Sequence, residues 1–161
     1  MHKSFKYRLY PTKAQERCLA ETLEECRWLY NQLLSQRKAA WEERRETLGL
    51  YAQAATIPSL KSERETLKVV HAQVLQNVAM RIDLAMKAFF RRVKSGDTPG
   101  YPRFRGANRY NSFTYPQAPV GCKLVGKWLH LTRIGSVQVV LHRPLEGRPK
   151  TVTIQRLTTS G

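Results

Sequence analysis

Residues 89–105 read FFRRVKSGDTPGYPRFR and divide the chain into two parts of different character. The sequence before them has helical period and mixed charge, and the sequence after them has strand-like alternation and almost no acid. The stretch breaks at Gly96 and Pro99 and then alternates aromatic rings with guanidinium groups up to Arg105. Arginines beside aromatic rings suit a phosphate backbone with unstacked bases. A solvated loop can carry the same residues, so the rest of the chain has to decide.

The charge of the chain favours a polyanionic partner. Its 161 residues, enough for one domain or two small ones, hold 28 Lys and Arg against 12 Asp and Glu, a net charge of +16. Nucleic acid is the first partner that such an excess indicates, and an anionic membrane surface is the second. Residues 98–161 carry ten basic residues and one acidic residue, Glu146. Because no apolar run is long enough to cross a bilayer, we expect a cytoplasmic protein with no membrane partner.

The first 95 residues read as one strand followed by helices. In residues 2–10, apolar Phe5, Tyr7 and Leu9 alternate with basic residues, which predicts a half-buried strand with a basic outer face. A capping-box pattern at 12–15 then starts a helix that runs to about residue 46, where the charged residues 36–46 predict a solvated or ligand-facing extension. We expect a connector over 49–58, a short helix over 59–68 and a third helix over 72–94.

The remaining sequence predicts short strands. Alternation with period two and Pro or Gly breaks place them at 111–115, 120–125, 127–132, 135–142 and 150–158. Short strands at this spacing are typical of a small barrel. The expected fold class is therefore α+β.

Catalytic and metal-binding patterns are missing from the sequence. The cysteines Cys18, Cys26 and Cys122 form no C-x2-C pair, and the four histidines show no ligand spacing, so we expect no metal site. Hydrolysis of a phosphodiester by metal ions needs converging carboxylates, and the acids here lie mostly beside Lys or Arg in the helical part. The sequence predicts a binding module with no catalytic residues of its own.

The order of motifs resembles the N-terminal half of TnpB, the transposon-encoded RNA-guided DNA endonuclease similar to type V CRISPR effectors. The strand ending RLYPT at 8–12 is followed by CRWLYN at 26–31, LQN at 75–77, AFFRR at 88–92 and GYPRFR at 100–105. The resemblance covers nearly the whole chain. It implies a wedge or OB-like barrel from residues 1–11 and 107–161, lacking its last strand, and a helical recognition lobe with an exit loop over 12–106.

In this family, barrel and lobe bind a guide RNA and read a short motif beside the target in double-stranded DNA, while base pairing reads the rest of the sequence. Carried over by position, the resemblance gives these motif-reading residues: Tyr51, Gln73, Gln76, Asn77, Phe113, Thr114 and Tyr115. Gln and Asn can bond adenine edges, and Thr or Tyr can touch a thymine methyl group. Solvation of a helix face is the alternative for Gln76 and Asn77. The residues expected to bind the nucleic-acid backbone are Lys6, Arg8, Arg81, Arg91, Arg92, Arg103, Arg105, Arg109 and Lys123.

The family's RuvC-like nuclease domain is expected beyond residue 161, together with its Mg²⁺ ions and structural Zn²⁺, so no cofactor is expected here. A C-terminal nuclease portion is therefore a further possible partner. Three alternatives stay open: a nuclease-less DNA-binding repressor, the structural half of a split nuclease, and a nonspecific polyanion binder.

Overall fold

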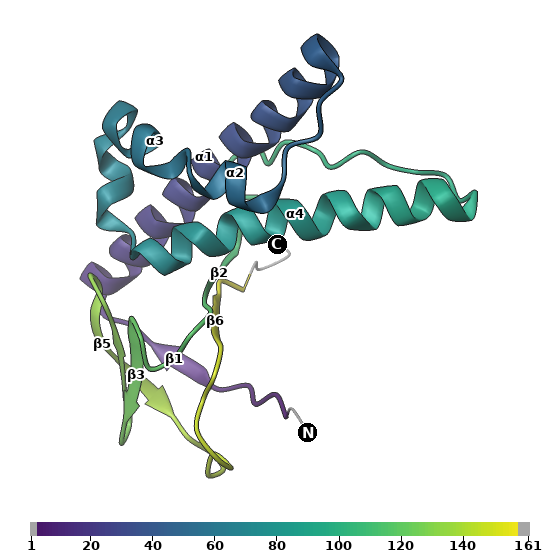
Figure 1. Cartoon of the computed structure of the whole chain (residues 1–161). Coiled ribbons are helices and arrows are strands. Elements are labelled where there is room, and N and C mark those ends of the chain that lie inside the picture. The colour runs from purple at the N-terminus through teal and green to yellow at the C-terminus, as the bar shows by residue number, and fades with distance from the viewer. Residues whose placement is uncertain (1–2, 158–161) are drawn as a thin grey trace.

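Long helices lie over two small antiparallel sheets in the computed structural model, which describes residues 3–157 (Figure 1). The helical part follows the strand β1 (Arg8–Tyr10) and contains α1 (Lys13–Arg44), α2 (Leu50–Ala54), α3 (Ile57–Glu63), the 3-10 helix η1 (Glu65–Val69) and α4 (Ala72–Ser95). The strands that follow are β2 (Ser112–Tyr115), β3 (Cys122–Val125), β4 (Trp128–Leu131), β5 (Gly135–Val140) and β6 (Val152–Gln155). The α+β class predicted from the sequence is confirmed.

The helix α1 begins at the predicted capping box. Thr12 Oγ1 accepts a hydrogen bond from the Gln15 amide at 3.2 Å, and Gln15 Oε1 accepts one from the Thr12 amide at 3.0 Å. These two bonds satisfy donors that the first turn of a helix leaves without partners. Gln15 Nε2 also donates to the backbone oxygen of Ser136 at 2.7 Å, so the same residue ties the start of α1 to β5.

The helix α4 has the strongest amphipathic pattern of the chain. Leu75, Val78 and Ile82 are buried at helical spacing against α1 and β2. Gly96 ends the helix at φ 78°, a left-handed conformation that glycine adopts without steric cost. The second half of α4 extends beyond the sheets (Figure 1), and the chain returns beside it.

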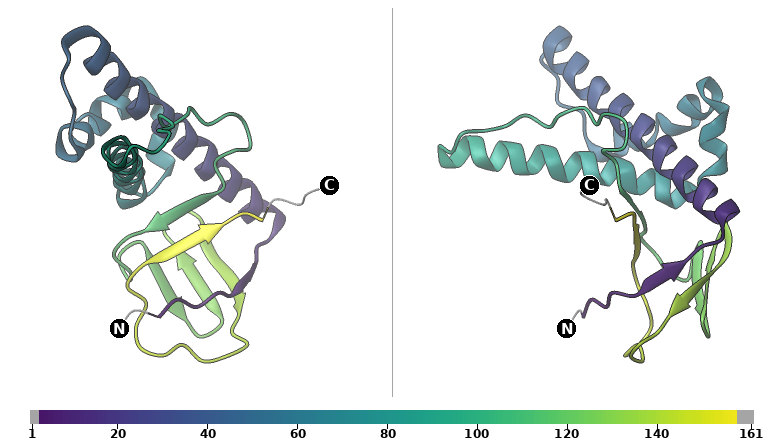
Figure 2. Two further views of the ribbon diagram at one scale, coloured as in Figure 1. Left: turned by 90° about the vertical axis from the view of Figure 1, so that its right-hand side faces the viewer. Right: turned by 180° about the vertical axis from the view of Figure 1, so that it is seen from behind.

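The strands form two separate sheets. One has four strands in the order β1-β5-β4-β3, and the other contains β2 and β6 alone. Figure 2 shows β2 and β6 lying across one face of the four-stranded sheet. The barrel prediction is wrong, because within residues 3–157 the sheets do not join into a closed ring. The strands are three to six residues long, and the connections between the sheets carry prolines, which cannot donate to a ladder.

One hydrophobic core runs through both parts. It joins Leu29 and Leu33 of α1 to Phe113 of β2 and to Leu131 and Val137 of the four-stranded sheet. The strands lie in residues 8–10 and 112–155 and the helices in 13–95, as the expected arrangement has them. Whether 1–11 with 107–161 and 12–106 are separate domains stays a prediction. Residue 158, the predicted end of the last strand, lies outside the described residues.

Three predicted segments of the first 70 residues differ from the observed elements. The first strand covers only Arg8–Tyr10 of residues 2–10, although Phe5, Tyr7 and Leu9 are half-buried as the alternation requires. The expected connector over 49–58 contains α2, and the expected helix over 59–68 is divided between α3 and η1. Pro58 lies in the first turn of α3, where proline is tolerated, and does not end a loop.

Candidate nucleic-acid interface

The exit segment, residues 96–109, returns from the far end of α4 toward β2 and passes close to α1 (Figure 2). It contains no helix or strand, so side chains of the helices have to hold it in place. Three hydrogen bonds converge on the backbone of Arg105. Its amide donates to Asn31 Oδ1 at 2.8 Å, and its carbonyl oxygen accepts from Asn31 Nδ2 and from Arg27 Nη1, both at 2.9 Å. Arg27 and Asn31 are four residues apart and thus share one face of α1.

Aromatic contacts hold the middle of the exit segment. Tyr101 packs edge-on against Phe89 of α4, with ring centroids 5.2 Å apart. Lys38 of α1 places its Nζ 5.7 Å from the Tyr101 centroid and 5.2 Å from the Phe104 centroid. Phe104 is 48% exposed, so its ring remains at the surface. A cation near the face of an exposed ring contributes roughly 0.5–1 kcal/mol.

The exit segment and the two long helices enclose a groove of about 570 Å³, which we call the arginine groove. Its walls come from Tyr30 of α1, from α4 at Ala85, Ala88 and Arg92, and from residues 102–106 and 109. Four of the predicted backbone-binding residues line it: Arg92, Arg103, Arg105 and Arg109. None of its lining residues is acidic. Arginines along one groove without a carboxylate are suited to the oxygens of several phosphates.

The arginines of the groove keep most of their donors available. Arg92 Nη2 donates to the Gly100 oxygen at 3.1 Å, and the Arg105 guanidinium lies 5.5 Å from the Tyr30 centroid. Within residues 3–157, the guanidinium groups of Arg103, Arg105 and Arg109 have no hydrogen-bond or ion-pair partner. These three guanidinium groups are therefore free to bind a ligand.

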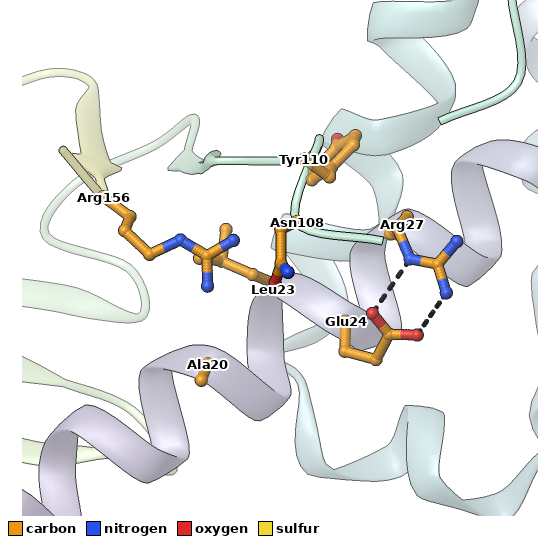
Figure 3. A pocket seen from close by; sticks show the side chains of 7 residues that line it. All are labelled: Ala20, Leu23, Glu24, Arg27, Asn108, Tyr110 and Arg156. Atoms are coloured by element: carbon orange, nitrogen blue, oxygen red, sulfur yellow. Dashed lines mark hydrogen bonds and ion pairs between the residues drawn. The ribbon is translucent and has the colours of Figure 1, made fainter. Parts of the chain in front are cut away.

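A second, smaller hollow of about 180 Å³ has Arg27 in its wall (Figure 3). It is lined by Ala20, Leu23, Glu24, Arg27, Asn108, Tyr110 and Arg156. Glu24 pairs with Arg27 there, and the hydrogen bond from Arg27 lowers the pKa of Glu24 despite partial burial. A carboxylate held ionised disfavours a phosphate, so this hollow is not part of the candidate interface.

Arg81 contributes to the packing of the protein, although it was predicted to bind the nucleic-acid backbone. It donates to Ser112 O at 2.8 Å, to Thr114 Oγ1 at 3.0 Å and to Tyr110 Oη at 3.2 Å. The guanidinium thus joins α4 to β2, and three of its five N–H donors are occupied by the protein. We remove Arg81 from the expected phosphate contacts for this reason.

The other predicted backbone-binding residues do not reach the arginine groove. Arg91 is exposed on α4 but does not line the groove. Arg8 and Lys123 are exposed on β1 and β3 of the four-stranded sheet, and Lys6 is exposed just before β1. The predicted cations therefore fall into three places: the groove, the four-stranded sheet with the residues just before it, and the part of α4 outside the groove.

The proposed motif-reading strand is buried. Phe113 and Tyr115 are 1% exposed and Thr114 is 8% exposed. Thr114 Oγ1 also lies 2.9 Å from Thr153 Oγ1 of β6. The reason is that β2 lies between α4 and β6, so its side chains complete the core. We therefore remove all three from the expected DNA-reading surface.

The four helical motif-reading residues lie on two different helices. Tyr51 is 87% exposed on α2, whereas Gln73, Gln76 and Asn77 belong to the first two turns of α4. Gln73 Nε2 donates to Gln117 Oε1 at 3.0 Å, and its Oε1 is buried without a partner within residues 3–157. Gln76 is exposed and Asn77 is half-buried. Gln76 is thus the most accessible of the three on α4.

The sequence did not predict a buried polar network that connects the helices. Arg37, expected on a solvated extension, is 5% exposed and donates to Gln53 Oε1 at 2.7 Å and to Asp83 Oδ1 at 3.1 Å. Gln53 of α2 is fully buried and donates to the Leu33 oxygen at 2.7 Å. Burial alone would raise the pKa of Asp83, but hydrogen bonds from Lys87 and Arg37 outweigh it and lower that pKa. The network joins α2 to α1 and α4, the two helices that contact the exit segment.

Two further observations concern metals and membranes. Within residues 3–157, no three His, Cys, Asp or Glu side chains lie close enough together to hold a metal ion. In the same range, no helix has the length and apolar character needed to span a bilayer. Cys26 and Cys122 are buried free thiols, and burial raises the pKa of each to about 12.

Residues 1–46 match a helix-turn-helix domain family, HTH_OrfB_IS605. In this structure the described part of that region contains β1 and the single long helix α1. The matched residues include Arg27 and Asn31, which hold the exit segment. The match thus includes residues that support the candidate interface.

The chain is 27% identical over 157 residues to the putative RNA-guided DNA endonuclease InsQ of Escherichia coli (strain K12). This match covers 95% of the chain and 37% of InsQ, so the chain spans little more than a third of that relative. Together the two matches confirm the resemblance found in the sequence: the chain is similar to the N-terminal part of a TnpB-family RNA-guided endonuclease.

Proposed function

We propose that this chain is a nucleic-acid-binding module that holds a guide RNA and the duplex DNA beside the target, with no catalytic residues of its own. The observation that supports this most is the arginine groove. Four arginines line it, no acidic side chain does, and three of their guanidinium groups have no partner within residues 3–157. The similarity to InsQ, an RNA-guided DNA endonuclease by name, supports the same role.

The groove is suited to shape recognition. Arginine contacts to phosphates fix the register of a nucleic acid without reading its sequence. We assign sequence reading to Gln76, with Tyr51, Gln73 and Asn77 as further candidates, because amide side chains can bond adenine edges in a major groove. Cleavage would belong to a C-terminal nuclease portion, which would also hold the Mg²⁺ and Zn²⁺ ions. Such a protein would act in the prokaryotic cytoplasm, on DNA.

Binding measurements with the RNA from the end of the transposon that carries this gene test the proposal. We expect the chain to bind this RNA more tightly than an unrelated RNA of equal length. Equal affinity for the two RNAs would refute specific guide binding and favour nonspecific attraction.

A triple variant tests the groove itself. Arg103→Gln, Arg105→Gln and Arg109→Gln together should weaken binding and reduce the salt slope of the affinity by roughly 0.9 for each duplex phosphate that an arginine no longer neutralises. The matched control replaces Lys3, Arg44 and Lys68 by Gln, which removes the same charge from exposed residues that pair with surface carboxylates. If both triple variants lose the same affinity, net charge and not the groove drives binding.

A further inference from the structure

The outer face of the four-stranded sheet combines exposed aromatic rings with cations. In the antiparallel register, Tyr10 of β1 lies opposite Gln138 of β5, Gln138 opposite Trp128 of β4, and Trp128 opposite Val125 of β3. Directly opposed residues share a face of the sheet, so these side chains form one row across all four strands. Tyr10 is 48% exposed and Trp128 is 44% exposed.

This face is not needed for the core of the protein. The opposite face supplies Leu129, Leu131, Val137 and Val139, all of which are buried. The aromatic rings on the exposed face are therefore not used in packing and are available to contact a partner. The two rings are separated by β5, so they stand two strand spacings, or about 10 Å, apart.

The cations around the rings favour an anionic partner. The Arg8 guanidinium lies 5.5 Å from the Tyr10 centroid, and Lys127 Nζ lies 5.7 Å from the Trp128 centroid. Lys123 of β3 is directly opposite His130 of β4, whose cross-strand partner on β5 is Ser136. None of the four strands contains an acidic residue.

We propose that this sheet face binds unpaired nucleotides, with bases stacked on Tyr10 and Trp128 and with phosphates bound by Arg8, Lys123 and Lys127. Stacking on these side chains needs a base with an exposed face, and the bases of a duplex have none because they are stacked on one another. The sheet therefore selects single strands, as other sheet surfaces do that stack two or three bases on exposed aromatic rings. An apolar protein partner would leave these cations without counter-charges.

The inference rests on the proposed nucleic-acid binding and assigns a second surface, separate from the arginine groove, to the unpaired part of the ligand. The test uses three probes of equal length: an oligouridine RNA, an oligothymidine DNA and a duplex DNA. The variants Trp128→Thr and Tyr10→Thr remove a ring and keep a β-branched residue that suits a strand. Trp41→Ala is the matched control, because Trp41 is 51% exposed on α1 and also has a cation, Arg45, 5.4 Å from its ring centroid.

We expect each ring variant to bind the single strands ~5- to 150-fold more weakly, the range that the loss of one base–aromatic stack gives. The salt slope should not change, because both variants keep every charge, whereas Lys123→Gln should lower it by about 0.7 for single strands. Duplex binding and circular dichroism should match the unmodified protein, and Trp128→Phe should restore most of the affinity. Quenching of tryptophan fluorescence by oligouridine should disappear in Trp128→Thr and persist in Trp41→Ala.

The outcomes separate this inference from the proposed function. If the groove variants weaken duplex binding but Trp128→Thr binds oligouridine normally, the sheet proposal is overturned and the proposed function stands. If Trp128→Thr weakens single-strand and duplex binding equally, the ring does not select unpaired bases and the sheet proposal also fails. If the groove variants leave duplex binding unchanged, the groove assignment fails, whichever result Trp128 gives. The oligouridine RNA and the oligothymidine DNA differ both in the 2′-hydroxyl and in the methyl group of the base. A preference for either one would show which single strand the sheet favours and would support the sheet proposal.

Discussion

Asn31 is the residue whose loss should loosen the exit segment most selectively. Its side chain makes two hydrogen bonds to the backbone of Arg105, at 2.8 and 2.9 Å. Each such bond contributes about 0.5–1.5 kcal/mol, so Asn31→Ala removes about 1–3 kcal/mol from the closure of the segment. Arg27 still donates to the Arg105 oxygen in this variant, so the segment loosens without leaving α1 altogether.

Hydrogen exchange at the Arg105 amide measures this loss directly, because that amide donates to Asn31 Oδ1. An opening free energy lower by 1–3 kcal/mol corresponds to exchange faster by roughly 5- to 150-fold. Asn77→Ala is the matched control: Asn77 is also half-buried on a long helix and has no side-chain hydrogen bond within residues 3–157. Both changes gain about 0.6 kcal/mol of helix propensity, so the difference between the variants isolates the two bonds.

The loosened segment should also weaken RNA binding, because Arg103 and Arg105 lose the backbone support that aims them into the groove. The reasoning is refuted if Arg105 exchanges at the same rate in Asn31→Ala and in Asn77→Ala. Faster exchange with unchanged RNA affinity would show that the segment closes as described but does not carry the interface.

Two further predictions concern stability. Asp83→Asn should cost about 3 kcal/mol in urea unfolding, because it leaves Arg37 charged and buried without its carboxylate. Hydrogen bonds from Lys87 and Arg37 lower the pKa of Asp83 against the effect of burial, so the ionised carboxylate stabilises the fold at pH values above the ordinary aspartate pKa. This contribution is lost as the pH falls below that value and the carboxylate becomes protonated. The same loss of stability in acid should be absent in Asp83→Asn, and an unchanged acid profile would contradict the assignment. Gly121→Ala should destabilise by about 2–3 kcal/mol, because φ is +77° and the new Cβ would lie 2.8 Å from the ring of His71, the cap of α4. Gly126→Ala, with φ +59° and no atom within 4 Å, should show only the backbone cost of about 1 kcal/mol, and equal losses in thermal unfolding would rule out the clash.

Much of the fold could be predicted because its signals are local. The capping box at Thr12 and the left-handed Gly96 mark helix ends through bonds within a few residues. Alternation placed every strand of residues 112–155 within a few residues of its observed position. The helix α2 was missed because it is short and is held by Gln53, whose bonds to Leu33 and Arg37 depend on tertiary packing.

The site was harder to predict because burial depends on neighbours distant in the sequence. Four arginines of the exit segment and α4 were expected to bind phosphates, and the fold brings them into one groove. Phe113, Thr114 and Tyr115 were assigned to the surface, although β6, about 40 residues away, pairs with their strand and α4 packs against it. Trp128 was not predicted as a binding residue. The alternation around Leu129 indicates only that Trp128 faces outward, and its alignment with Tyr10 follows from the register of the strands, which the sequence does not reveal.

The two basic surfaces differ in the part of a nucleic acid that they suit. The arginine groove offers guanidinium groups to phosphates, which are present in paired and unpaired segments alike. The sheet offers open rings, which gain energy only from bases that are not paired. A folded RNA with a stem and an unpaired strand would use both surfaces, and each contact would raise the effective concentration of the other. The net charge of +16 attracts any nucleic acid, so selectivity for such an RNA has to come from this difference in chemistry between groove and sheet.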